Sequence, residues 1–232
     1  MPSSIRAVTL ALLIGATGAA QTHLQIPTID LVYPAPNGSI FDVFCGTLLK
    51  INISQAAVEE TVHRRPELQL LWDREGPTYL SATFSEIGLP FPYKEMQATL
   101  TVCTGVPSMS APLFVSVRNF LPSAVARYPD SHFVERLYHE LMHTYVSRVN
   151  ATSELRKKYK AEPPLVLNHL HVMALEKMVL LKLEKTEELK LLTVDYEPVL
   201  PPEYKRAWEI VDKIEGHRPF VAELKQLSTN NH

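Results

Sequence analysis

Two histidines and a glutamate within five residues constrain this chain more than any other feature of its sequence. The run His139-Glu140-Leu141-Met142-His143 places the histidines four positions apart, and in an α-helix this spacing puts both imidazoles on one face. Both rings can then reach one zinc ion (Zn²⁺). Glu140 is offset by about 100° around the helix, so its carboxylate can stand beside the metal and accept a proton from water. The run therefore predicts a helix over residues 131–149 that carries a zinc site.

The residues around the motif favour such a helix. Its back is apolar and comprises Phe133, Val134, Leu137, Leu141, Tyr145 and Val149. The other side carries His132 and Arg136 together with the two motif histidines. A buried helix whose polar stripe contains both histidines is what a catalytic cleft requires. The alternative interpretation is a helix with two surface histidines and no metal.

The segment from Tyr138 to Thr144 resembles the active-site helix of the zincin superfamily of metallopeptidases. The resemblance extends over the motif and its helix, and the rest of the chain resembles no family that we can name. It implies zinc ligands at His139 and His143, with Glu140 as the general base and acid. It also implies a substrate strand that lies above the helix.

The resemblance bears on the third zinc ligand. Val146 and Val149 stand where the metzincin branch has glycine and histidine, so the resemblance favours the gluzincin branch, which takes its third ligand from a glutamate on a later helix. The predicted helix over residues 165–192 offers Glu176 in an apolar stripe, where a carboxylate is costly to bury unless it is paired or bound to metal. Glu176 is therefore the expected ligand. His169 lies in the same stripe and is the alternative, and Glu176 would then be part of a salt bridge.

The helix predicted over residues 165–192 also carries a candidate for a second catalytic group, in addition to Glu140. His171 could polarise a substrate carbonyl, or it could be a surface histidine. The residues alone do not separate these two interpretations.

The N-terminal twenty residues are typical of a secretory signal. Arg6 gives a positive start, residues 7–14 are mostly apolar, and Gly18-Ala19-Ala20 offers small residues for cleavage before Gln21. The apolar run is too short to span a membrane. We expect a secreted or periplasmic protein with one domain over residues 21–232, although a buried N-terminal helix is the alternative.

The two cysteines agree with export. Cys45 and Cys103 both lie in apolar surroundings, and an even pair in an oxidising compartment is a candidate disulfide. The alternative is a pair of buried free thiols.

The order of the predicted elements indicates an α+β fold. Residues 21–44 read as an extended arm, a helix is expected from Ser54, and Pro66 is expected to begin a second helix. Residues 97–103 and 111–117 alternate or are β-branched and predict a small antiparallel sheet. After this the chain is expected to be mainly helical, in a zincin-like catalytic half. Its helices are predicted over residues 131–149, 151–160, 165–192, 203–215 and 219–227.

Composition and charge limit the partners. A net charge of −2 argues against an electrostatic nucleic-acid binder, because no basic excess is present to displace counterions from phosphates. The expected function is a zinc-dependent hydrolase, more specifically a metallopeptidase that acts on a peptide or protein substrate. The alternative is a secreted binding or scaffold protein that keeps the fold without turnover. A fourth protein ligand that closed the metal site would favour this alternative.

Overall fold

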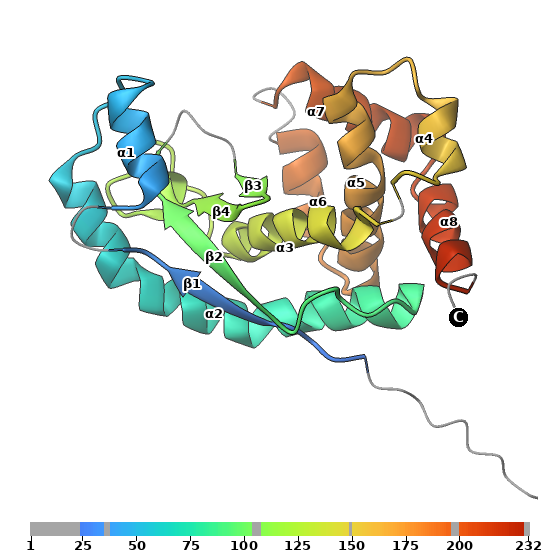
Figure 1. The fold of residues 1–232 in the computed structure, drawn as a ribbon, viewed down its shortest axis with the longest axis horizontal. Coiled ribbons are helices and arrows are strands. Elements are labelled where there is room, and N and C mark those ends of the chain that lie inside the picture. Colours follow the sequence, from blue (N-terminus) through green and yellow to red (C-terminus); the bar gives the residue numbers. More distant parts are fainter. Residues whose placement is uncertain (1–23, 35–37, 104–107, 149, 196–199, 230–232) are drawn as a thin grey trace, which may run out of the picture.

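The computed structural model describes residues 24–34, 38–103, 108–148, 150–195 and 200–229. In this part of the chain a small sheet and a group of helices lie side by side, and one long helix runs beneath both (Figure 1). The fold is therefore mixed α+β, as the sequence predicts. The predicted signal segment lies outside the described residues.

The sheet has four strands in the order β1-β2-β4-β3. The strands β1 (Thr28–Val32), β2 (Glu95–Thr101) and β4 (Leu113–Ser116) run parallel to one another. The short strand β3 (Met109–Ser110) is antiparallel to β4. The sequence predicts an antiparallel sheet, and among the described strands only β3 and β4 pair in this way.

The prediction of an antiparallel sheet is thus wrong for the strands over 97–103 and 111–117. Alternation predicts a strand but not its direction. The chain returns through β3 between the two strands, so β2 and β4 run the same way. The predicted extended arm over 21–44 also contains β1 and the start of α1. Ile29 and Leu31 of β1 are buried in the core.

The helix α1 (Ile40–Thr47) is fixed to the end of β2 by a disulfide and a buried carboxylate. Cys45 is bonded to Cys103, as the sequence predicts. Asp42 accepts hydrogen bonds from the hydroxyl of Thr101, at 2.6 Å, and from the backbone N–H of Val102, at 2.8 Å. The disulfide closes a separation of 58 residues, for which chain entropy predicts about 4 kcal/mol of stabilisation.

The helix α2 (Gln55–Ile87) is continuous for 33 residues and begins at the N-cap Ser54. The prediction that a second helix begins at Pro66 is wrong, because Pro66 and Pro77 both lie inside α2. Each proline removes one backbone hydrogen bond, yet burial against β1, α3, α5 and α8 maintains the helix. Gly76 is required beside Pro77, since a Cβ there would come within 2.5 Å of the Trp72 ring.

The second half is helical within its described residues. The α-helices are α3 (Ser131–Val146), α4 (Glu154–Lys158), α5 (Pro164–Lys182), α6 (Thr186–Lys190), α7 (Pro202–Glu209) and α8 (Arg218–Thr229). A 3₁₀ turn, η1 (Arg118–Phe120), precedes α3, and π-helical turns η2 (Leu191–Asp195) and η4 (Ile210–Ile214) follow α6 and α7.

The helix α5 is central to this half and contacts α2, α3, α6, α7 and α8. The helix predicted over 165–192 ends at Lys182, because Glu184 has a positive φ of 57°. In the described part of the chain, α5 is the one helix long and apolar enough to cross a bilayer, and 67% of its most apolar stretch is buried inside the protein. The surrounding helices account for its apolar sequence.

Candidate metal centre

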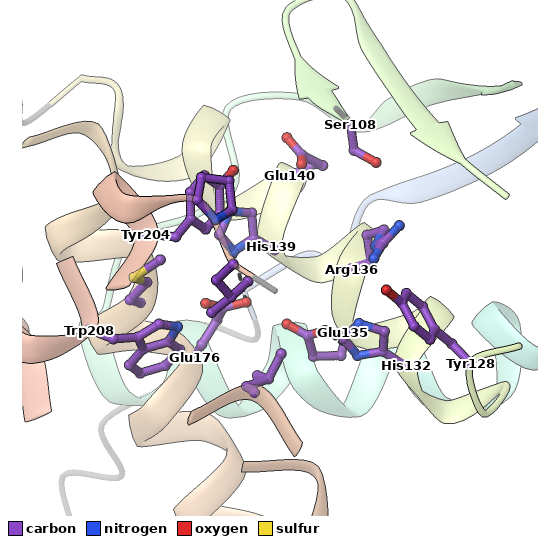
Figure 2. A pocket seen from close by; sticks show the side chains of 14 residues that line it. Ser108, Tyr128, His132, Glu135, Arg136, His139, Glu140, Glu176, Tyr204 and Trp208 are labelled. Atoms are coloured by element: carbon purple, nitrogen blue, oxygen red, sulfur yellow. Dashed lines mark hydrogen bonds and ion pairs between the residues drawn. The ribbon is translucent and has the colours of Figure 1, made fainter. Parts of the chain in front are cut away.

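The motif lies on α3, which also contributes His132, Glu135 and Arg136 to the site, and α5 contributes Glu176 (Figure 2). A cavity of about 270 Å³ opens beside them and is lined by residues of α3, α5 and α7. His139 and Glu140 both line this cavity. Potential metal ligands and the carboxyl group of Glu140 therefore line the same cavity.

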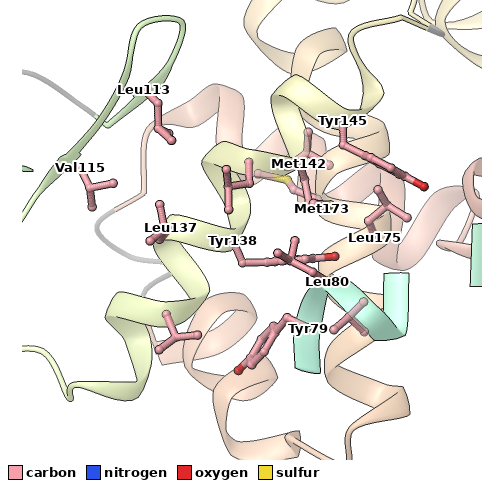
Figure 3. Packing of buried hydrophobic residues seen from close by; sticks show 14 of the residues in the cluster. Tyr79, Leu80, Leu113, Val115, Leu137, Tyr138, Met142, Tyr145, Met173 and Leu175 are labelled. Carbon is pink, nitrogen blue, oxygen red and sulfur yellow. The ribbon is translucent and has the colours of Figure 1, made fainter. Parts of the chain in front are cut away.

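The back of α3 is fixed in the hydrophobic core (Figure 3). Tyr138 is buried and its hydroxyl lies 2.7 Å from that of Thr83 on α2. Tyr145 is also buried and donates a hydrogen bond to the carbonyl of Leu89 at 2.9 Å. These contacts fix the rotation of α3 about its axis, and so they fix the direction of its polar stripe.

Three imidazoles converge in front of α3. The Nε2 atoms of His139 and His143 are 3.2 Å apart. His169 from α5 joins them, and the three ligand atoms all lie within 4.8 Å of one another. Two nitrogens bound to one zinc ion at 2.0–2.1 Å with tetrahedral angles are separated by about 3.3 Å. The spacing of the first pair thus fits a shared zinc ion.

The protonation of His169 can be read from its hydrogen bond. Its Nδ1 lies 2.7 Å from the carbonyl oxygen of Leu165, which can only accept, so Nδ1 carries the proton. Nε2 then carries the lone pair, and it is buried without a hydrogen-bond partner among the described residues. An unprotonated buried nitrogen with no donor is suited to bind a metal ion.

Glu176, the expected third ligand, lies on the other side of His139. Its Oε1 is 2.8 Å from Nδ1 of His139, so it faces the nitrogen opposite to the one that faces His143. Glu135, His139 and Glu176 also form a group with ligand atoms within 4.8 Å of one another. In that group, however, the ligand atoms already have partners, since Glu176 contacts His139 and Glu135 forms an ion pair with His132 at 2.9 Å.

The chain of buried groups His132, Glu135, Glu176 and His139 was not expected from the sequence. Burial acts to raise the pKa of Glu135, but the ion pair with His132 outweighs it and the pKa is lowered. Burial and the adjacent Glu135 carboxylate raise the pKa of Glu176 well above its ordinary value. Glu135 lies four residues before His139, and this helical spacing is the signal that could have revealed it.

The motif residues are largely buried, and this shifts their pKa values. Burial, followed by the neighbouring imidazoles, holds the pKa of His139 well below its ordinary value. Burial and then His169 lower the pKa of His143 to about 3. Burial raises the pKa of Glu140 to about 8, against the opposing effect of Arg136. The histidines are therefore held neutral, which is the form that binds metal.

The walls of the cavity differ in character. On the α7 side, Tyr204 and Trp208 contribute rings, and the ring centroid of Tyr204 lies 4.1 Å from that of His169. On the α3 side, Arg136 contributes a charged group and Glu140 a carboxyl group (Figure 2). One wall can therefore hold an apolar group while the other faces a polar one.

His171, the second expected catalytic residue, does not line this cavity. Its Nε2 lies 2.7 Å from Glu223 on α8, and its ring meets that of Phe220 edge-on. It is buried between α5 and α8. The structure thus separates His171 from the three converging histidines.

Comparisons of the chain with protein-family models, with curated proteins and with solved structures found no match.

Proposed function

We propose that this protein is a zinc-dependent hydrolase, and more specifically a peptidase. The observation that carries the proposal is the convergence of His139, His143 and His169, since His139 also lines a cavity together with the buried Glu140. Three protein ligands with an open position are typical of catalytic zinc sites, whereas structural sites are closed by four. His169 replaces Glu176 as the third ligand in this proposal.

The residues have distinct roles. Glu176 would accept a hydrogen bond from Nδ1–H of His139 and so leave Nε2 for the metal, and the Leu165 carbonyl would do the same for His169. A zinc ion held by the three imidazoles would polarise a substrate carbonyl, lower the pKa of a bound water and favour the ionised form of Glu140. Ionised Glu140 accepts a proton from the attacking water and returns it to the leaving amine as the C–N bond breaks.

Other features agree with this proposal. The hydroxyl of Tyr204 can donate a hydrogen bond to the oxygen of the scissile carbonyl, since Tyr204 lines the cavity next to His139 and His169. Secretion remains part of the proposal, because the Cys45–Cys103 disulfide is consistent with an oxidising compartment.

The test combines metal analysis with a peptide-library cleavage assay. Purified protein is expected to contain about one zinc ion per chain and to cleave peptides. Glu140→Gln is expected to retain the zinc and to lower kcat by about 10²–10⁴-fold, because it removes the proton acceptor alone. The matched control is Glu154→Gln, an exposed residue paired with Lys157. Zinc-free protein, or full activity in Glu140→Gln, would contradict the proposal.

A further inference from the structure

Arg136 is held at the cavity by two aromatic rings. Its guanidinium carbon lies 5.4 Å from the ring centroid of Phe120 and 5.5 Å from that of Tyr128. Contacts of this kind fix the orientation of a guanidinium without using its N–H groups. The N–H groups remain available for a planar, bidentate acceptor.

No carboxylate of the described residues lies within ion-pair distance of Arg136. The charge of Arg136 opposes the rise that burial causes in the pKa of Glu140, and it contributes to the lowered pKa of Glu135, but neither carboxyl group pairs with it directly. A partly buried arginine that lines a cavity without an anionic partner is suited to bind an anionic group from a ligand.

The position of Arg136 relative to the metal centre limits what this group can be. Arg136 precedes His139 and Glu140 by three and four residues on α3, so about 4.5–6 Å separates them along the helix axis. One or two residues of extended peptide span this distance, at about 3.3–3.6 Å each. The cavity, at about 270 Å³, is at the small end for a ligand site. This volume suits the end of a peptide substrate better than a long internal stretch of peptide.

We propose that Arg136 binds a carboxylate of the substrate, and that the source is the C-terminal carboxylate of a peptide cleaved one or two residues from its end. This inference rests on the proposed peptidase function and names its substrate class. The rings of Tyr204 and Trp208 across the cavity favour an apolar side chain near the scissile bond. Arg136 is thus a specificity-determining residue.

The activity test compares N-acetyl-alanyl-phenylalanine as the free acid with its C-terminal amide. The free acid is expected to have a kcat/KM about 10–100-fold higher, mainly through KM, because a charge-assisted pair forms only with the acid. Arg136→Gln is expected to abolish this preference, and Arg136→Lys to restore part of it. The matched control is Arg127→Gln, whose exposed guanidinium lies 3.9 Å from Asp130. It is expected to keep the full preference.

A further set of substrates tests whether the carboxylate comes from the C-terminus of the peptide or from a side chain. Amidated peptides that carry glutamate or glutamine next to the scissile bond test for side-chain recognition. A preference for glutamate that depends on Arg136, with no preference between acid and amide, contradicts the C-terminal assignment. An equal preference in wild type and Arg136→Gln overturns the role of Arg136.

A binding measurement separates this inference from the peptidase proposal. Calorimetry measures the affinity of N-acetylphenylalanine and of its amide for the Glu140→Gln protein, which is expected not to turn over. Tighter binding of the acid that is lost on adding Arg136→Gln supports the carboxylate site even if the wild type cleaves no peptide. Equal binding of acid and amide overturns it even if peptides are cleaved.

Discussion

His169 and His171 are two residues apart on α5 and both are buried, yet they lie in different chemical surroundings. Each has one nitrogen that is bonded to an oxygen and one buried nitrogen without a hydrogen-bond partner among the described residues. Near His169 two further imidazoles are present. Near His171 the neighbours are the Glu223 carboxylate and the Phe220 ring.

The difference teaches that burial and a spare nitrogen do not by themselves indicate a metal ligand. Two residues correspond to about 200° around a helix, so the two rings face opposite sides of α5. On one side, ring nitrogens from α3 and α5 lie within 4.8 Å of one another, and His139 among them lines the cavity. On the other side, Glu223 joins α5 to α4 and α8, because it also accepts hydrogen bonds from Ser153 and from the backbone N–H of Leu155.

The largest expected contrast is in zinc affinity. His169→Ala should weaken zinc binding by more than about 100-fold, because losing a ligand costs more than losing an outer partner of one. His171→Ala should leave the affinity unchanged. Competition titration with a chromophoric chelator measures both, and equal losses in the two variants would contradict the assignment.

A smaller effect on zinc affinity is expected for the two glutamates that contact these histidines, Glu176 at His139 and Glu223 at His171. Glu176→Gln should weaken zinc binding by about 10–100-fold, since in the proposed site Glu176 contacts His139 and is not itself a ligand. Glu223→Gln should not change it. If Glu176→Gln loses as much affinity as His169→Ala, Glu176 is itself a ligand, as the sequence led us to expect.

Stability should show the reverse contrast. Glu223→Gln weakens charge-assisted hydrogen bonds from His171, Ser153 and the backbone, so it should lower the free energy of unfolding by about 2 kcal/mol. The melting temperature should fall by about 4–8 °C. Calorimetric scans measure this, with Glu154→Gln as the exposed control. An unchanged melting temperature in Glu223→Gln would show that the junction is not structural.

The smallest expected effect is on the pH dependence of stability. Burial opposes ionisation of Glu223, but the hydrogen bonds from His171, Ser153 and Leu155 outweigh it and lower its pKa to about 2. A lowered pKa stabilises the fold above the unfolded value of about 4.3, and this contribution is lost as the pH falls toward 2. Glu223→Gln should remove that part of the acid-unfolding profile. A profile identical to that of wild type would exclude the contribution.

The sequence predicts α3 well because both the motif and the apolar back of the helix are local patterns. The disulfide and the mixed α+β class were also predicted. The direction of the strands was not, since it depends on how β3 turns the chain between β2 and β4. The sequence could not decide between His169 and Glu176, because both lie in one stripe and their distances to His139 depend on how α5 packs against α3.

The same limit applies to His171 and to Glu135. His171 was a candidate to polarise a substrate carbonyl, or else a surface histidine, but it is buried and its partner is on α8, 52 residues later in the chain. Glu135 pairs with His132 at helical spacing within α3, but its second neighbour, Glu176, comes from α5. Long-range partners decide the surroundings of His171 and the contact between Glu135 and Glu176, and local patterns do not show them.

The continuity of α2 has a mechanical consequence. A helix of 33 residues is a rod about 50 Å long, and it is joined to the sheet through β1 and to the helical half through α3, α5 and α8. The sheet therefore cannot rotate away from the helical half unless α2 bends. Bending is easiest where a backbone hydrogen bond is already missing, so Pro66 and the Gly76-Pro77 step are the two places where it would flex.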